Sequence, residues 1–345
     1  MASALYFHVS RNMRSTHFVL IFLLSAMIPT AANAADSDVL VSGVNEFETG
    51  MSDDGSGMTT SDPAISKIEL QFNSPESRPF GALLRLKHEP DEDEVDEAYL
   101  RYQFGGKNKF AIIAGESYTP FGHFDSSLIT DSMTLTVGES RLQGLKFESD
   151  RGDWTASVFA STDSSDSSSR VASGAGINFH RGKDWRGYGL GIAAISNIAI
   201  ADEIHSALSS PGVNSKTVPA LAAHAIYGDG TNQIIVDAVT ATERFAPGEL
   251  AFAGDGAQPG AWRTEVARHF QFLDKPMTVA ASWQQSHEAL ALSLPQTRIG
   301  AGLSAELSRN ASLALELLHD TAYPVSVGGS GGTYDTLTLK FALTF

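Results

Sequence analysis

The chain has 345 residues, a formal net charge of −16 and no cysteine. The strong acidity argues against nucleic acid as a partner, and the lack of cysteine excludes a disulfide framework, a thiolate metal site and a lipidated N-terminal cysteine. No run of 18 apolar residues follows residue 34, so we expect no membrane-spanning helix.

Residues 1–34 have the pattern of a signal peptide. Arg11 and Arg14 precede an apolar run from Phe18 to Ile28, and the sequence from Ala32 to Ala34 supplies a small-x-small cleavage site. We therefore predict export and a mature domain of residues 35–345. Loss of two arginines takes the formal charge from −16 to about −18.

Alternation of apolar and polar residues recurs along the whole mature chain. Sixteen segments of about ten residues show it, from residues 39–49 to residues 333–345. A half-buried β-strand has this period of two, and a transmembrane strand needs apolar residues only at every second position. The pattern predicts an all-β protein.

The connections between these segments alternate in length. Those at 105–108, 182–184 and 228–230 are short, whereas those at 50–63, 117–140, 198–216 and 242–260 are long. This alternation places the two sets at opposite ends of one object, as in bacterial outer-membrane barrels. A soluble β-sandwich does not predict it. We therefore expect a transmembrane antiparallel β-barrel of 16 strands in the outer membrane of a Gram-negative bacterium.

The C-terminal strand ends on Phe345. Leu337, Leu339, Phe341 and Leu343 alternate before it with polar residues, so one face of the strand is suited to lipid. A terminal phenylalanine on such a strand resembles the signal read by the barrel assembly machinery, which we expect to be a partner.

The polar face of each strand identifies the residues that would line the interior. The expected pore-lining set is Lys67, Arg85, Lys87, Glu97, Tyr99, Arg101, Lys146, Arg263, Glu265, Arg298 and Lys340. The alternation also turns Glu69, Glu148, Glu306 and Glu316 inward. Such an interior suits a channel for a polar solute, although the same residues could form salt-bridge ladders that stiffen the wall.

The acidic segment Glu89–Glu97 is expected at a rim of the barrel. It could bind divalent cations that bridge to lipopolysaccharide phosphates. It lacks the spacing of a dedicated calcium loop, so a solvated acidic tip is the favoured interpretation. Lipids and lipopolysaccharide are the expected surroundings, and we predict neither a cofactor nor a resident metal.

The long connection after the fifth strand, from Gly115 to Ser140, is too apolar for an outer loop tip. It predicts a loop folded into the barrel, which either narrows the passage or packs on the wall for stability. The residues expected at this constriction are Glu116, Tyr118, Pro120, Phe121, Gly122, Asp125, Asp131, Glu139 and Arg141.

This region resembles the LbtU-type siderophore porins of the bacterial outer membrane. The resemblance is carried by Glu97–Leu100, Gly115, Tyr118-x-Pro120-Phe121-Gly122, Phe124 and the run Thr130–Glu139. It implies passive uptake of a ferric siderophore or a similar polar solute, without an energy-coupled plug.

Three alternatives remain open at this stage. They are a general diffusion porin, a closed structural or adhesive barrel, and an outer-membrane enzyme. No Gly-x-Ser-x-Gly or His-Glu-x-x-His pattern accompanies His180, His269 or His319, so we predict that the protein is not an enzyme. The alternation does not distinguish a monomer from a trimer.

Overall fold

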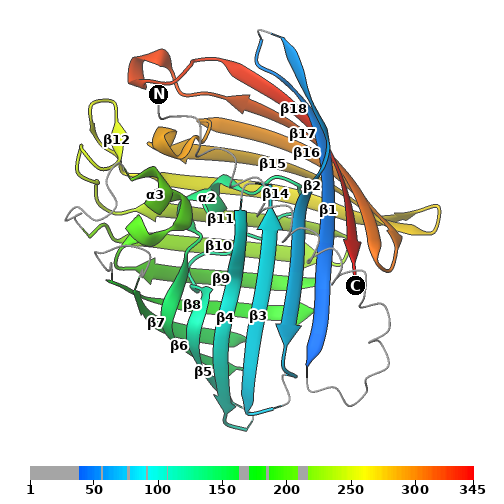
Figure 1. The fold of residues 1–345 in the computed structure, drawn as a ribbon, viewed down its shortest axis with the longest axis vertical. Coiled ribbons are helices and arrows are strands. Elements are labelled where there is room, and N and C mark those ends of the chain that lie inside the picture. Colours follow the sequence, from blue (N-terminus) through cyan, green and yellow to red (C-terminus); the bar gives the residue numbers. More distant parts are fainter. Residues whose placement is uncertain are drawn as a thin grey trace, which may run out of the picture.

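The computed structural model describes residues 39–55, 57–75, 78–90, 92–106, 108–162, 171–183, 186–208 and 217–345. The predicted signal peptide, residues 1–34, lies outside these ranges. Within them, 16 antiparallel strands form one closed barrel, in which β1 (Leu40–Asp53) pairs with β18 (Thr333–Thr344) to complete the ring (Figure 1). The predicted all-β fold, a closed 16-stranded barrel, is confirmed.

The remaining barrel strands follow in chain order. They are β2 (Met58–Asn73), β3 (Phe80–Glu89), β4 (Glu92–Phe104), β5 (Lys109–Tyr118), β6 (Arg141–Arg151), β7 (Trp154–Thr162), β8 (Val171–Lys183), β9 (Arg186–Ile195), β10 (Ala220–Asp229), β11 (Asn232–Ala241), β14 (Gly260–Phe272), β15 (Lys275–His287), β16 (Thr297–Ser308) and β17 (Ala311–Thr321). A small hairpin of β12 (Ala251–Phe252) and β13 (Asp255–Gly256) stands apart from the barrel sheet.

Short helices occur in the connections. They are α2 (Met133–Gly138), α3 (Asp202–Ala207) and the 3₁₀ turns η2 (Ile198–Ile200), η3 (Leu290–Leu292) and η4 (Val325–Val327). No helix in the described part of the chain is long and apolar enough to cross a membrane.

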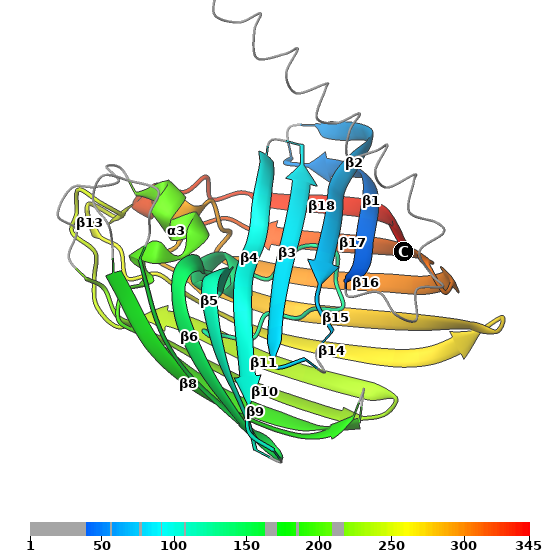
Figure 2. The ribbon, with the colours of Figure 1, turned by 60° about the horizontal axis from the view of Figure 1, so that its bottom comes forward.

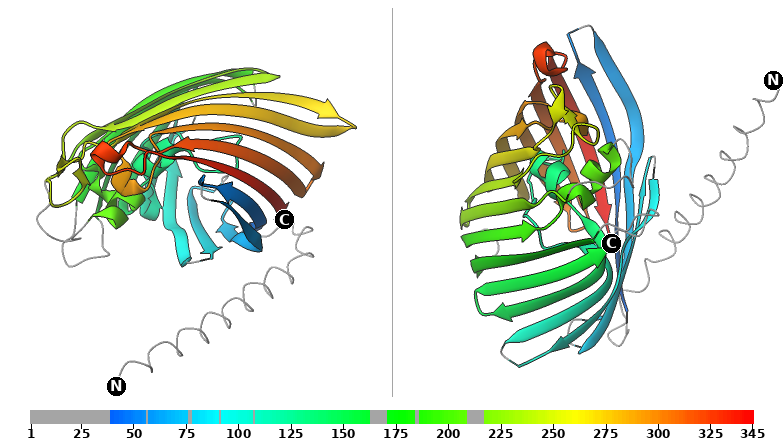
Figure 3. Two further views of the ribbon diagram at one scale, coloured as in Figure 1. Left: turned by 90° about the horizontal axis from the view of Figure 1, so that it is seen from above. Right: turned by 90° about the vertical axis from the view of Figure 1, so that its left-hand side faces the viewer.

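The long connections gather at one end of the barrel, where the short turns after β1 and β3 also lie, and the other tight turns lie at the opposite end (Figure 2). Leu273 and Asp274, which join β14 to β15, have φ values of 51° and 60°, as the two central residues of a type I′ hairpin require. The views in Figure 3 show the strands wrapping round between these two ends. A barrel closed in this way leaves no sheet edge unpaired.

One predicted long connection is wrong. Residues 50–63 are mostly strand, because β1 extends to Asp53 and β2 begins at Met58. Two register shifts, after Glu46 and after Glu48, interrupt the alternation there. Hydroxyl groups then bond across the pair, as when the Thr49 hydroxyl donates to the Ser61 carbonyl at 2.7 Å, so this hairpin carries no apolar stripe.

The barrel is apolar outside and polar inside, the reverse of a soluble protein. On β17, Leu315 and Leu317 are 43% and 52% exposed, whereas Glu316 between them is 1% exposed. Near the tight turns an aromatic band runs from Phe80 through Tyr102, Phe104 and Phe110 to Phe147, with successive ring centroids 4.6–5.9 Å apart. Such bands mark the membrane–water interface of β-barrels.

The C-terminal residue closes the barrel against a glycine. The backbone amide of Phe345 donates to the Gly43 carbonyl at 3.1 Å, and the Gly43 amide donates back at 3.2 Å. A Cβ atom at Gly43 would lie 2.5 Å from the Glu69 carbonyl oxygen and 2.6 Å from Cζ of Phe345. Only glycine therefore lets the Phe345 ring lie on β1.

We expect Gly43→Val to impair closure of the barrel, because the added side chain must displace either β2 backbone or the Phe345 ring. Overpacking of this kind costs about 1–3 kcal/mol, so the folded, heat-modifiable fraction on a gel should fall. Gly106→Val is the matched control, since an added Cβ there meets nothing within 4 Å. Equal folded fractions for the two variants would contradict this account of Gly43.

Candidate functional site

The connection between β5 and β6, residues 119–140, crosses the barrel; we call it the inner loop. Its helix α2 packs on β14, β11 and β15, and β7 to β11 separate β6 from β14 along the barrel wall. The loop thus leaves one wall and reaches the far one (Figure 1). The Ser132 side chain caps α2 by accepting from the Leu135 amide, and Met133 and Val137 are fully buried on its wall-facing side.

Five polar side chains of the far wall are buried beneath the inner loop; we call them the latch. They are Asp237, Arg263, Glu265, Gln284 and Glu316, each at most 2% exposed.

Arg263 joins the parts of the latch. Its Nε donates to Asp237 Oδ2 at 2.7 Å, its Nη1 lies 3.3 Å from Glu265 Oε2, and its Nη2 donates to the Asp125 carbonyl oxygen at 2.7 Å. One guanidinium thus binds two wall carboxylates and the backbone of the inner loop, which satisfies donors that would be costly to bury alone.

The other latch residues accept hydrogen bonds from the loop. Glu265 accepts from the Ser127 amide at 2.7 Å and the Ser126 hydroxyl at 2.6 Å. Glu316 accepts from the Ile129 amide at 2.7 Å and the Thr130 hydroxyl at 2.5 Å. Gln284 accepts from the Met133 amide at 2.8 Å, and Asp237 from the Thr134 hydroxyl. The wall thereby supplies partners that the loop backbone lacks within itself.

The prediction that Arg263 and Glu265 line an open pore is therefore wrong. Alternation places both side chains on the inward face, but the inner loop covers them, leaving exposures of 0% and 1%. Their role in the structure is to hold the loop.

On β18 and β1–β6, inward charged residues keep part of their surface; we call this set the charge ladder. It comprises Glu46, Lys67, Glu69, Arg85, Lys87, Glu94, Glu97, Lys146, Glu148 and Lys340. Its closest ion pairs are Arg85–Glu97 at 2.9 Å, Lys87–Glu94 at 3.0 Å, Lys146–Glu148 at 3.3 Å, Lys67–Glu69 at 3.4 Å and Lys340–Glu46 at 3.4 Å. The lysine and arginine side chains are 16–30% exposed. Solvent therefore reaches the ladder, in contrast to the latch.

The other predicted pore-lining residues lie near these groups or farther round the barrel. Tyr99 and Arg101 are partly exposed on β4, and a Cβ atom at Gly81 would lie 3.4 Å from Nη2 of Arg101. Arg298 on β16 forms a two-point ion pair with Asp320 on β17, with both N–O distances 2.8 Å.

A β-bulge in β4 places two consecutive carboxylates inside the barrel. Arg85 pairs with Glu97 and Leu86 pairs with Val95, which leaves Asp96 as the extra residue. Asp96 and Glu97 are only 2% and 8% exposed, whereas Val95 is 43% exposed. The alternation of the sequence missed Asp96. The apolar residues Val95 and Ala98 are three positions apart instead of two or four, and this break in the alternation was the available sequence signal.

Asp96 receives three partners at the root of the inner loop. The Tyr118 hydroxyl donates to it at 2.7 Å, Arg141 Nη1 at 3.2 Å and Arg85 Nη1 at 3.4 Å. Arg141 also lies 2.5 Å from Glu94 and 3.7 Å from Glu116. Three of the predicted constriction residues, Glu116, Tyr118 and Arg141, are therefore brought together here.

The other predicted loop residues spread along its path. Phe121 is 1% exposed, and Gly122 has a φ of 93°, a conformation that favours glycine. The Asp125 side chain is 90% exposed and lies 3.4 Å from His123. Asp131 is exposed, and Glu139 ends α2. Of these, Asp125 and Asp131 are exposed to solvent, and Glu139 is partly exposed.

Inward glycines on β8 and β9 make room for the inner loop. A Cβ atom at Gly176 would lie 3.0 Å from the Pro120 carbonyl oxygen, and one at Gly191 would overlap the imidazole of His224 and the Asn178 amide. His224 in turn faces His123 of the loop, with ring centroids 4.9 Å apart. These glycines therefore allow close approach of the loop and of His224.

The connections at the long-loop end add an apolar core over the same side of the barrel. Ile198, Ile204, Phe245, Leu250 and Val137 of α2 belong to one buried cluster. The loops after β9 and β11 thus pack together with the inner loop. Among the described residues, no group of three or more His, Asp or Glu side chains is arranged to hold a metal ion.

No family model matches the chain, and its curated relatives include UPF0422 proteins of Legionella and Coxiella. A UPF0422 protein of Legionella pneumophila (strain Lens) is 25% identical over 246 residues, which cover 65% of this chain and 46% of the relative. A UPF0422 protein of Coxiella burnetii (strain RSA 493 / Nine Mile phase I) is 23% identical over 256 residues, 70% of this chain and 55% of the relative. The match thus spans about half the length of these relatives.

Solved structures with the same architecture include three porins. OprB of Pseudomonas putida has a TM-score of 0.61 at 9% identity and covers 89% of this chain and 94% of its own. An anion-selective porin from Comamonas acidovorans has a TM-score of 0.58 at 12% identity, covering 89% and 99%. Salmonella typhi OmpF has a TM-score of 0.58 at 13% identity, covering 89% of this chain and 97% of its own. The chain has the fold of an outer-membrane porin. The finer LbtU-type resemblance stays a prediction.

Two carboxyl groups with raised pKa values, Glu139 and Asp202, lie where the end of the inner loop meets α3. Burial, with Asp202 and Asp131 nearby, raises the pKa of Glu139 to about 7, and burial raises the pKa of Asp202 to about 6. The Asp202 amide donates to the Glu139 carbonyl oxygen at 3.0 Å, so the two residues link the inner loop to α3.

We expect the stability of the folded barrel to fall as pH rises from 4.5 toward 8. The protonated form of Glu139 is favoured in the folded state, so its contribution is complete below the unfolded pKa of 4.5 and is lost as pH passes about 7. Glu139→Gln should match wild type at pH 4 and exceed it by on the order of 1–2 kcal/mol at pH 8. Guanidinium unfolding in detergent at both pH values measures this, with the exposed Asp125→Asn as control. A Glu139→Gln barrel with the pH dependence of wild type would refute it.

Proposed function

We propose that the protein is a passive outer-membrane porin that admits a small polar solute between the charge ladder and the inner loop. The observation that carries this proposal is the contrast between the two walls. Arg263 on one wall is 0% exposed beneath the loop, whereas Lys67 and Arg85 on the other are 30% and 24% exposed. A loop held by buried ionic contacts narrows a barrel without filling its charged side.

The charge ladder supports selection by charge and hydrogen bonding. Its lysines and arginines are paired with carboxylates at 2.9–3.4 Å, so the wall offers both signs in a fixed arrangement. We propose that Arg85, Lys87, Arg101 and Lys146 steer the solute electrostatically, with Asp125 and Asp131 of the inner loop opposite them.

A ferric siderophore is the solute that we propose. The LbtU-type resemblance around residues 97–139 supports it, and a passive route fits a barrel whose described residues form no separate plug domain. We further propose that the barrel assembly machinery recognises Phe345, which lies 42% exposed at the end of β18, and that lipid and lipopolysaccharide surround the apolar outer face.

Reconstitution in planar bilayers tests the porin proposal. We expect discrete conductance steps from the wild-type barrel. Lys146→Glu in the charge ladder should shift the cation-to-anion permeability ratio toward cations. Lys275→Glu, at a tight turn outside the passage, should leave that ratio unchanged. A correctly folded barrel that stays silent under voltage would overturn the proposal.

Absence of conductance would instead favour a closed barrel, and one observation supports this alternative. The long connections pack their apolar residues together over one side of the mouth, as with Ile198, Phe245 and Leu250. Conductance without solute preference would favour general diffusion. Iron-limited growth of a deletion strain on labelled ferric complexes distinguishes general diffusion from siderophore uptake. Only siderophore uptake predicts that the deletion strain no longer accumulates one particular ferric complex.

A further inference from the structure

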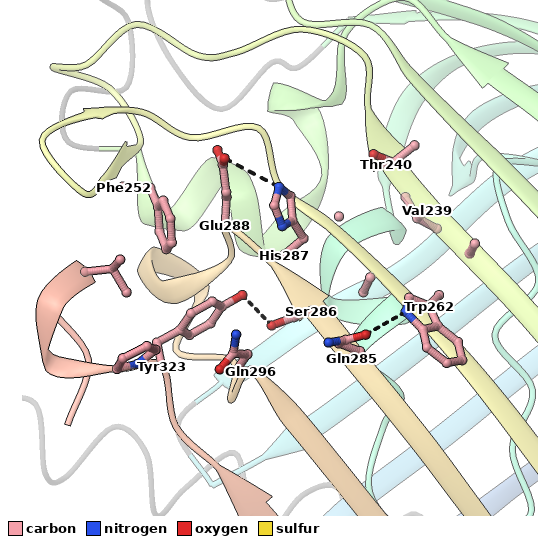
Figure 4. Close-up of a pocket in the computed structure, with 15 residues that line it drawn as sticks. Val239, Thr240, Phe252, Trp262, Gln285, Ser286, His287, Glu288, Gln296 and Tyr323 are labelled. Carbon is pink, nitrogen blue, oxygen red and sulfur yellow. Dashed lines mark hydrogen bonds and ion pairs between the residues drawn. The ribbon is translucent and has the colours of Figure 1, made fainter. Parts of the chain in front are cut away.

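A pocket of about 610 Å³ lies at the rim of the barrel, at the barrel end that carries the long connections. The ends of β11, β14 and β15 form one side, and the connections after β11 and β17 form the other (Figure 4). We call it the rim pocket; its boundary includes Phe252, Trp262, Gln285, Glu288, Gln296 and Tyr323. Its volume is in the range of small-molecule sites, about 300–1,000 Å³.

Aromatic rings with fixed orientations bound the rim pocket. Phe252 and Tyr323 meet edge to face with centroids 5.6 Å apart, and the Tyr323 hydroxyl bonds to the Ser286 hydroxyl at 2.7 Å. Trp262 donates its indole N–H to the Gln285 side-chain oxygen at 3.2 Å. Figure 4 shows Trp262 and Tyr323 on different sides of the pocket. Tyr323 is only 3% exposed and is part of the wall, so Phe252 and Trp262, which are both partly exposed, are the rings that a ligand can meet.

The polar lining is close to electrically neutral. Glu288 forms a two-point ion pair with Arg244 at 2.7 Å and accepts from the Gln258 amide at 2.7 Å, so its charge is offset. In the described part of the chain the lining contains neither lysine nor arginine. An anionic ligand would lack a counter-charge beyond His287, and a cation would have to compete with Arg244.

We propose that the rim pocket binds a neutral saccharide. A pyranose ring has an apolar C–H face, which matches an aromatic ring, and a rim of hydroxyl groups, which match the amides of Gln285 and Gln296 and the Thr240 hydroxyl. The site goes beyond transport, since it lies outside the latch and the charge ladder. Two sources offer this chemistry: sugars of lipopolysaccharide, because the long-loop end faces outward in outer-membrane barrels, and soluble oligosaccharides.

Isothermal titration calorimetry of the detergent-solubilised barrel tests the proposal. The probes are maltotriose, tri-N-acetylchitotriose, and lipopolysaccharide with a complete or a truncated core. We expect saturable binding of at least one probe. Binding only of the complete-core lipopolysaccharide identifies the membrane source, and binding of a trisaccharide identifies the soluble one.

Two variants test whether the probe binds in the rim pocket. Trp262→Ala and Gln296→Ala should each weaken binding by about tenfold or more, since each removes one contact surface. Trp154→Ala is the matched control, because this exposed tryptophan begins β7 at the tight-turn end. Heat-modifiable mobility verifies that each variant is folded. Absence of binding up to about 10 mM probe, or equal affinity of wild type and both pocket variants, overturns the proposal.

Discussion

Arg263→Ala will destabilise the folded barrel by about 3–5 kcal/mol, the cost of leaving buried charges unpaired. Asp237 and Glu265, 2% and 1% exposed, lose their common partner, and the Asp125 carbonyl loses its donor. Guanidinium unfolding in detergent measures the loss. Single-channel recording should also show noisier and larger currents, because the inner loop is no longer held at Asp125.

Two further variants separate this explanation from a general effect of losing an arginine. Arg298→Ala also breaks a two-point ion pair, but one whose partners are 13% and 17% exposed, so its cost should be clearly smaller. The triple variant Arg263→Ala, Asp237→Asn, Glu265→Gln should regain part of the stability, since it removes the orphaned charges. If Arg263→Ala costs no more than Arg298→Ala, the latch does not work as described.

Glu316→Ala will release the middle of the inner loop and widen the passage. The backbone amides of Ile129 and Thr130 lose the carboxylate that accepts their hydrogen bonds. Leaving such groups unsatisfied costs about 1–3 kcal/mol each, so the loop should move toward solvent. We expect higher single-channel conductance and faster passage of large solutes in liposome swelling. Glu316→Gln, which keeps one acceptor oxygen, should be intermediate.

Asp153→Ala is the matched control, since Asp153 is exposed in the tight turn between β6 and β7, away from the charge ladder and the inner loop. An independent route to the same result starts from Gly302 on β16, where a Cβ atom would lie 2.7 Å from Cδ2 of Leu128 in the inner loop. Gly302→Val should push Leu128 off the wall and raise conductance with Glu316 intact. Unchanged conductance in both Glu316→Ala and Gly302→Val would show that the inner loop does not limit the passage.

Much of the barrel follows from local patterns. Alternation requires only the pleat of a strand, so it predicted the fold, the closed ring and the inward direction of Glu316 and Lys340. It failed where the pleat is interrupted. The bulge at Asp96 and the register shifts in β1 each change the phase within a strand, and neither needs a characteristic residue.

The inner loop shows the same division. Its apolar composition indicated that it is not an outer tip. Tyr118 and Arg141 were expected at a constriction, and the structure has them at the root of the loop, at the end of β5 and the start of β6. Its contacts with the far wall join residues such as Ser126 and Glu265, 139 positions apart. Alternation along one strand contains no information about a segment that distant.

By itself, the amino-acid sequence determined most of the strands, the faces of those with unbroken alternation and most of the pattern of long and short connections, because each depends on neighbours within a few residues. Only the tertiary structure decided that Arg263 and Glu265 hold the inner loop instead of lining the passage, and that Phe252, Trp262 and Tyr323 border one pocket. Burial is a property of what lies opposite a side chain. That partner comes from another part of the chain, brought near only when the barrel closes.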